Sequence, residues 1–171
     1  ARRQELWRTR DRWPPAVARG HGPLPSYSDQ VPLVSTSPTD PEPPVGDLRF
    51  MAPVAHRPWA GVRDATSYGA TAQRGDGHEP TTIPEPSIPG DSTLNVNVFT
   101  PSPGELEAAL PVLVYIHGGG FHAGSPASPW HDGKAFNRDG VVTVTISYRL
   151  GFDGFGWIED APHNRGVRDW L

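Results

Sequence analysis

The chain has 171 residues, the size of one ordinary domain, and its net charge of −4 at pH 7 gives no basic field for nucleic acid or an anionic membrane. No apolar run approaches the ~18 residues of a membrane-spanning helix, and the early arginines precede no apolar segment, so we expect no membrane span, no secretory signal and a cytoplasmic location. The sequence contains no cysteine, which excludes disulfides, thiolate catalysis and cysteine-ligated zinc.

The N-terminal quarter differs from the rest of the chain. Residues 1–41 contain seven prolines that break any helical or alternating pattern, so we predict an irregular segment, disordered or translated out of frame. Residues 42–171 are predicted to form one domain, which opens with a long stretch rich in turn residues.

The first regular element is predicted to begin at Leu94. Leu94, Val96 and Val98 alternate with asparagines, which is the period of a strand with one buried and one wetter face. Pro101 ends this strand. We expect the leucine and the two valines to face the core.

Two further runs have the length of strands. Residues 112–116 are an unbroken apolar run, which indicates a strand covered on both faces as in a parallel sheet, and residues 141–148 are a second, β-branched run. The intervening 24 residues are enough for a right-handed crossover. They include a predicted short helix from Asp132 to Arg138, with Asp132 as N-cap and Gly140 near its C-terminal end. The fold class is therefore α/β, with a mostly parallel sheet and crossover helices.

The end of the chain predicts one more helix. After the second run comes a turn rich in glycine and phenylalanine, and a helix is expected from Gly166 to Leu171 with Asn164 as its N-cap. Natural domains rarely stop in the first turns of a helix, so we expect the domain to extend past residue 171.

The residues that carry chemistry lie where the first apolar run ends. Residues 117–121 read His-Gly-Gly-Gly-Phe. Three glycines let the backbone approach a substrate closely and point successive N–H groups into one cavity, as stabilisation of a tetrahedral oxyanion requires. After a parallel strand and a histidine, this pattern is typical of the oxyanion loop of α/β-hydrolases. A flexible turn or a phosphate loop is the alternative, although neither the dinucleotide nor the Walker fingerprint is matched.

Two other patterns are weaker indications of a functional site. Gly90-Asp91-Ser92 matches the GDS motif of another class of serine hydrolase, but it follows a proline-rich loop rather than a buried strand. The histidines at positions 78, 122, 131 and 163 lack the spacing of metal ligands, so we expect no metal and no zinc.

Several segments together resemble the type-B carboxylesterases, the family of para-nitrobenzyl esterases and cholinesterases. The resemblance is carried, in the family's order, by PPVGDLRF at residues 43–50, LNVNVFTP at 94–101, PVLVYIHGGGFHAG at 111–124, TISYRLG at 145–151 and NRGVRDW at 164–170. It implies the N-terminal part of an α/β-hydrolase fold, left incomplete by this chain.

The resemblance also implies an activity, the hydrolysis of small carboxylic esters by a serine, without a cofactor. The backbone N–H groups of Gly119 and Gly120 would bind the oxyanion, while Gly118 and His117 would support the loop. The nucleophile, base and acid of this family are absent from residues 1–171, so the chain alone is expected to be inactive. An esterase-like adhesion or scaffold module without the serine is the alternative function, and a GDS-type hydrolase is a further one.

Departures from the family have consequences of their own. Asp91-Ser92-Thr93 stands where the secreted members have Glu-Asp-Cys, which favours an intracellular, bacterial-type enzyme. The family's Gly-Ile-Pro-Tyr-Ala is missing before Glu42, and codons exist for residues 36–40 that encode Ile-Pro-Tyr-Gly in a shifted frame. The nucleotide sequence of the gene tests this frame hypothesis.

The family also places two structural ion pairs at these motifs. By analogy, Arg49 is expected to pair with Asp91, and Arg149 with Asp169. We further expect the isolated chain to leave one side of the strand at residues 141–148, and the apolar side chains of residues 112–116, uncovered.

Overall fold

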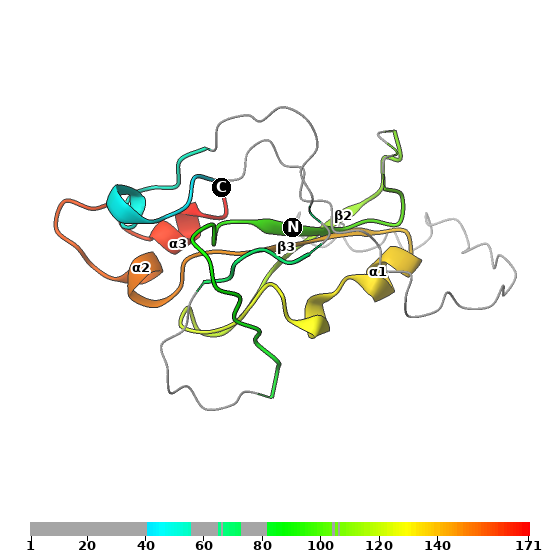
Figure 1. Cartoon of the computed structure of the whole chain (residues 1–171). Coiled ribbons are helices and arrows are strands. Elements are labelled where there is room, and N and C mark those ends of the chain that lie inside the picture. Colours follow the sequence, from blue (N-terminus) through cyan, green and yellow to red (C-terminus); the bar gives the residue numbers. More distant parts are fainter. Residues whose placement is uncertain (1–40, 56–64, 66, 73–81, 104, 106) are drawn as a thin grey trace, which may run out of the picture. The chain divides into compact units, whose positions relative to one another are not determined.

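A computed structural model describes residues 41–55, 65, 67–72, 82–103, 105 and 107–171. The predictions made for residues 1–40 lie outside this part of the chain. The elements, in chain order, are η1 (Gly46–Leu48), β1 (Val96–Phe99), β2 (Val112–Ile116), η2 (Pro129–His131), α1 (Lys134–Arg138), β3 (Val142–Ile146), α2 (Gly151–Phe155) and α3 (Arg165–Arg168) (Figure 1).

The three strands form one sheet in the order β1-β3-β2. β2 and β3 are parallel, in a register that pairs Val112 with Val142 and Ile116 with Ile146. This confirms the α/β class and the crossover. β1 pairs antiparallel with β3, so the described sheet is mixed rather than mostly parallel. β3 is consequently the central strand, and the prediction that its ladder stays open on one side is wrong.

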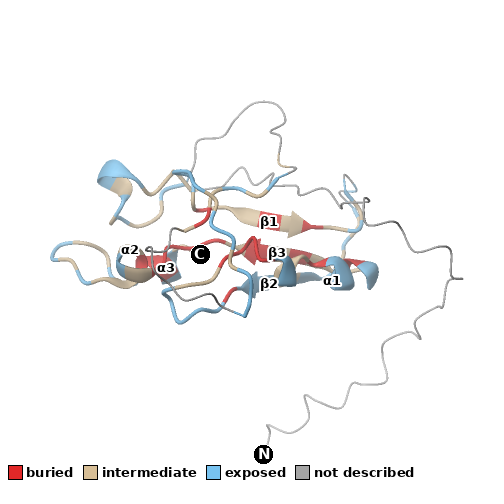
Figure 2. Cartoon of the chain, turned by 60° about the horizontal axis from the view of Figure 1, so that its bottom comes forward, coloured by how far each residue is buried: buried red, intermediate tan, exposed pale blue. Residues whose placement is uncertain are grey.

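The two faces of the sheet differ in composition. One face carries only β-branched apolar side chains, which the register aligns across all three strands. We call this the open face; it consists of Val96, Val98, Val112, Val114, Ile116, Val142, Val144 and Ile146. Val112 is 59% exposed and Val114 is 56% exposed. Figure 2 shows β2 mostly exposed beside the buried positions of β3.

The opposite face is the buried one, although it carries polar residues. Asn97, Thr143 and Thr145 are each 2% exposed or less. The amide of Asn97 donates to Thr145 Oγ1 at 2.9 Å, and the hydroxyl of Thr145 donates to the carbonyl oxygen of Pro126 at 3.1 Å. The prediction for β1 is therefore wrong for Val96 and Val98, whereas Leu94, just before the strand, is buried as expected at 2% exposure. Coverage of residues 112–116 on both faces stays a prediction for the complete domain. The expectation that their apolar side chains are uncovered in the isolated chain is confirmed.

The crossover helix begins two residues later than predicted. α1 starts at Lys134 because Gly133, with φ +66°, occupies the N-cap position. The carboxylate of Asp132 still accepts a hydrogen bond from the Lys134 N–H at 3.1 Å. Gly140, with φ +81°, follows the helix in the left-handed conformation expected of a C-terminal glycine.

The chain after β3 forms two short helices that lie side by side (Figure 1). The predicted turn is helix α2, and the predicted last helix is α3, which begins at Arg165. Asn164 occupies the N-cap position of α3, as expected, but its φ is +52° and its side chain makes no capping hydrogen bond.

Candidate active site

The glycine loop leaves the sheet at the carboxyl end of β2. His117 is buried, whereas Gly118, Gly119 and Gly120 are exposed. The backbone turns sharply here, with φ of +125° at Gly119, +61° at Gly120 and +66° at Phe121. Only glycine adopts such angles freely, so glycine suits positions 119 and 120, whereas Phe121 adopts its positive φ as a non-glycine residue.

Close backbone approach adds a second reason for glycine at two positions. A Cβ atom at Gly119 would overlap the carbonyl group of Ala123, and one at Gly124 would overlap the Gly118 carbonyl and the ring of His117. A Cβ at Gly118 or Gly120 would meet no atom within 4 Å. The loop is therefore closed on itself at Gly119 and Gly124 and open at the other two.

Hydrogen bonds fix the peptide planes on both sides of Gly119. The Gly118 carbonyl lies 3.0 Å from His117 Nδ1, and the Gly119 carbonyl accepts from the N–H groups of His122 and Ala123, both at 3.1 Å. Described residues contain no cis peptide, so each N–H points away from the carbonyl of its own plane. Holding these two carbonyls therefore aims the N–H groups of Gly119 and Gly120, which donate to no other described residue.

His117 is suited to hold the loop rather than to act as a base. A carbonyl oxygen only accepts hydrogen bonds, so Nδ1 carries the proton in the contact with Gly118. Burial lowers the pKa of His117, and the hydrogen bond to Gly118 opposes this effect in part. The imidazole is thus neutral near pH 7. Its Nε2 is buried without a partner among the described residues.

The chain that follows β3 supports the loop at both ends. Tyr148 donates its hydroxyl to the carbonyl oxygen of His117 at 2.8 Å, and Gly151 donates its N–H to the carbonyl oxygen of Phe121 at 2.7 Å. Phe121 also packs its ring on Phe155, at 4.5 Å between centroids. Sequence reasoning assigned no site role to Tyr148 or Gly151, although both stand in the TISYRLG segment that carried the family resemblance.

Neither alternative site assembles in the described residues. Ser92 is exposed directly after a bend at Gly90 and Asp91, and no described histidine hydrogen-bonds its hydroxyl. No cluster of three or more His, Cys, Asp or Glu that would hold a metal occurs in the described part of the chain. His78 lies outside it.

One of the two predicted ion pairs is present. The Arg149 guanidinium contacts both carboxylate oxygens of Asp169, at 2.6 and 2.9 Å, and both side chains are almost completely buried. Arg149 also donates to the carbonyl oxygens of Arg49, at 3.1 Å, and Met51, at 2.8 Å. It therefore ties the end of β3 to the N-terminal part of the domain.

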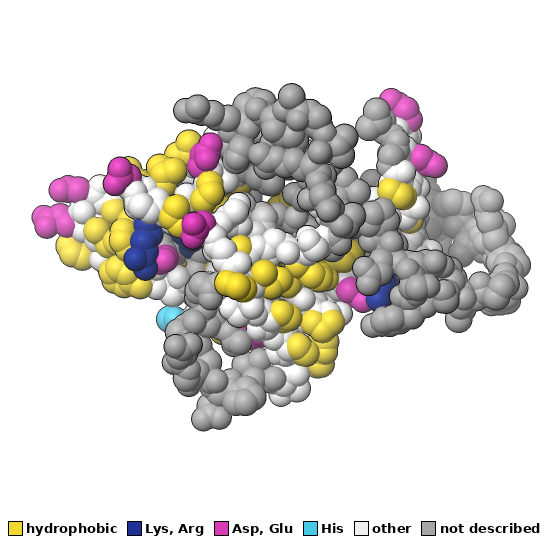
Figure 3. Space-filling view, viewed as in Figure 1, with side chains coloured by type: hydrophobic (Ala, Val, Ile, Leu, Met, Phe, Trp, Pro, Cys, Tyr) yellow, Lys and Arg dark blue, Asp and Glu magenta, His cyan; other side chains and the backbone are white. Residues whose placement is uncertain are grey.

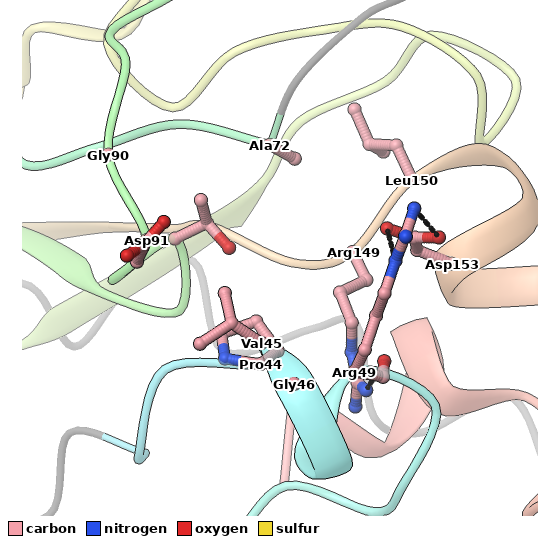
Figure 4. A pocket seen from close by; sticks show the side chains of 11 residues that line it. Pro44, Val45, Gly46, Arg49, Ala72, Gly90, Asp91, Arg149, Leu150 and Asp153 are labelled. Atoms are coloured by element: carbon pink, nitrogen blue, oxygen red, sulfur yellow. Dashed lines mark hydrogen bonds and ion pairs between the residues drawn. The ribbon is translucent and has the colours of Figure 1, made fainter.

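The other predicted pair is wrong. Arg49 contacts Asp153 at 3.1 Å instead of Asp91. All three residues line a pocket of about 380 Å³, and Figure 4 places Asp91 across this pocket from the Arg49–Asp153 pair. The sequence motif could not show that α2, predicted as a turn, carries a nearer carboxylate.

The parallel crossover, the glycine loop at the end of its first strand and the two oriented N–H groups together define the fold and loop type of an α/β-hydrolase. The chain belongs to the carboxylesterase family, whose sequence model matches residues 41–171. No described helix is long and apolar enough to cross a membrane.

Named relatives agree with this family. The chain is similar to para-nitrobenzyl esterase of Bacillus subtilis (strain 168), at 39% identity over 76% of this chain and 26% of the relative. It is also similar to phenmedipham hydrolase of Pseudarthrobacter oxydans, at 43% identity over 67% of this chain and 24% of the relative. Acetylcholinesterase of Bungarus fasciatus matches at 38% identity over 75% of this chain and 22% of the relative. A solved structure titled thermophylic PNB esterase superimposes with a TM-score of 0.66 at 36% identity, covering 77% of this chain and 28% of that one. The chain thus spans about a quarter of the length of these relatives.

Proposed function

We propose that residues 42–171 form the oxyanion-loop part of a serine carboxylesterase that hydrolyses small-molecule esters. The observation that carries this proposal is the pair of N–H groups at Gly119 and Gly120, whose peptide planes are held by hydrogen bonds and which have no acceptor among the described residues. The family and the names of the relatives support the same chemistry.

The reaction would proceed by acyl transfer. A serine hydroxyl loses its proton to a histidine and attacks the ester carbonyl carbon, and the carbonyl electron pair moves onto oxygen. The N–H groups of Gly119 and Gly120 bind this negative oxygen. Its collapse expels the alcohol, which takes the proton from the histidine, and water then releases the acid by the same two steps.

The division of roles follows the family resemblance. Residues 1–171 contain no Gly-x-Ser-x-Gly elbow, so the serine, its base and the acid are assigned to residues outside this sequence. His117 and Gly118 support the loop and do not react. Each oxyanion donor contributes about 3 kcal/mol to transition-state stabilisation in enzymes of this kind. A cytoplasmic location is also proposed, supported by Thr93 in the place of the cysteine of secreted members.

The test uses the full-length protein that contains these residues. We expect hydrolysis of para-nitrophenyl acetate and stoichiometric labelling by a fluorophosphonate probe. We expect Gly119→Val to lower kcat at least 100-fold with a much smaller change in KM, because the new side chain displaces one donor. A folded full-length protein that is neither labelled nor active would overturn the proposal in favour of a serine-less binding module. Labelling of residues 1–171 alone, lost on Ser92→Ala, would favour the GDS hydrolase.

A further inference from the structure

We propose that Tyr148 is a positioning residue for the oxyanion loop, acting through His117 on the Gly119 N–H. The inference rests on the proposed function, because it assigns to Tyr148 the task of aiming one of the two oxyanion donors. In this role Tyr148 itself contacts no reacting atom.

Two contacts join Tyr148 to the start of the loop. Its hydroxyl donates to the His117 carbonyl oxygen at 2.8 Å, and its ring stacks on the His117 ring at 4.5 Å between centroids and 24° between planes. The first contact fixes the peptide plane that links His117 to Gly118. The second fixes the plane of the imidazole, and with it the direction of the Nδ1–H that reaches the Gly118 carbonyl.

The effect passes on to the oxyanion donor through one more peptide plane. The Gly118 carbonyl and the Gly119 N–H belong to the same rigid plane, so a turn of the His117–Gly118 plane that breaks the 3.0 Å contact frees that N–H to turn. Tyr148 thereby controls the direction of the Gly119 N–H indirectly, through His117 and the Gly118 carbonyl. Misplacement of a catalytic group by about 1 Å can lower a rate by about 100-fold.

Tyr148 is itself held in place. It is 2% exposed, and the ring of Trp170 packs edge-on against it at 5.5 Å. Burial raises the pKa of Tyr148, so its hydroxyl keeps the proton that it donates throughout the working pH range of an esterase. The contact with the loop is the one hydrogen bond that its hydroxyl makes among the described residues.

The experiment compares Tyr148→Phe with Tyr115→Phe in the full-length protein. Tyr148→Phe removes the hydroxyl and keeps the ring stack, while Tyr115 packs on His131 and makes no hydrogen bond or ring contact with described residues of the loop. We expect Tyr148→Phe to lower kcat about tenfold at nearly constant KM, and to weaken a trifluoromethyl ketone inhibitor, which forms an oxyanion, by the same factor. Tyr115→Phe is expected to leave both unchanged. A merely structural role would lower the amount of folded enzyme without this equal loss.

The outcomes separate the two proposals. If the parent enzyme hydrolyses esters and Tyr148→Phe retains its kcat and ketone affinity, the role of Tyr148 is wrong while the esterase function stands. If the parent is folded but inactive, the function fails. The positioning is then read from exchange of the His117 Nδ1 proton, which is buried and donates to the Gly118 carbonyl: faster exchange in Tyr148→Phe than in Tyr115→Phe supports it, and equal exchange overturns it.

Discussion

The chain contains a buried and an exposed arginine–carboxylate pair, and the two are expected to contribute differently to the free energy of unfolding. Arg149 is 4% exposed and Asp169 fully buried, whereas Arg49 and Asp153 are 56% and 38% exposed. A buried charge left without its partner is costly, while an exposed pair gains little over hydration.

We therefore expect Asp169→Asn to destabilise the protein by about 3 to 5 kcal/mol, because Arg149 keeps its charge in a buried site. Asp153→Asn, the matched change at the exposed pair, is expected to cost less than about 1 kcal/mol. Urea unfolding of both variants measures the difference. Equal losses in the two variants would contradict the assignment of Arg149–Asp169 as the main structural pair.

The histidine of the loop predicts a pH dependence. Burial lowers the pKa of His117, so the unfolded chain takes up a proton at this residue at a higher pH than the folded chain does. The contribution of His117 to the free energy of unfolding is therefore fully present above the pKa that this histidine has in the unfolded chain. It is lost as the pH falls below that pKa.

The expected outcome is a lower urea midpoint at pH 5 than at pH 7, with a smaller drop in His117→Gln, whose side chain does not titrate. His131 has a pKa lowered by burial as well and contributes in the same direction. His163→Gln is the control, because His163 lies on an exposed part of the chain. An equal pH response in His117→Gln and the parent would show that His117 titrates alike in both states.

At the scale of elements, sequence patterns predicted the strands better than their faces or the short helices. The alternation in β1 predicts that the valines face inward, yet Asn97 is the buried residue, because Thr145 and the Pro126 carbonyl satisfy its amide. Such satisfaction depends on residues far along the chain, so no local pattern shows it. The glycine loop was predictable because its constraint is local: the backbone angles at Gly119 and Gly120 demand that residue type.

Helix α2 was missed for a physical reason. Two of its five residues are glycine, which gives it weak helix propensity. Its support comes from Arg165, which is completely buried and donates to the carbonyl oxygens of Phe152, Asp153 and Gly156 at 2.7 to 3.0 Å. Hydrogen bonds from Arg165 thus stabilise this helix, although its own sequence has low helix propensity.

Arg165→Met is accordingly expected to destabilise the protein by about 3 kcal/mol or more, because it leaves several buried carbonyls without donors. Arg168→Met, on the exposed side of α3, is expected to have an effect below about 0.5 kcal/mol. Thermal unfolding followed by circular dichroism compares the two. A loss in Arg168→Met as large as that in Arg165→Met would contradict a specific role for the buried guanidinium.

For the molecule as a whole, the open face dominates the behaviour of the isolated chain. Its side chains are β-branched and apolar on all three strands, and β2 exposes them most. Figure 3 shows further hydrophobic side chains at the surface among acidic ones. Apolar sheet surface of this extent favours association between chains.

Expressed alone, residues 1–171 are expected to be poorly soluble, and Val114→Lys to raise the soluble fraction by placing a charge in the middle of β2, the edge strand that exposes the open face most. Trp157→Lys is the control, since Trp157 is 71% exposed but lies outside the sheet. Sedimentation of lysates and light scattering measure the outcome. If Trp157→Lys restores solubility as well as Val114→Lys does, general surface charge rather than the open face governs aggregation.

The closure of the glycine loop has a consequence for how such a site diversifies. His122 and Ala123 contribute their backbone N–H groups to the Gly119 carbonyl, a task that any residue except proline performs. Their side chains carry no part of the loop's geometry and remain partly or fully accessible. Selection for new substrates is therefore free to vary these two side chains at the rim of the loop while the anion-binding geometry is inherited unchanged.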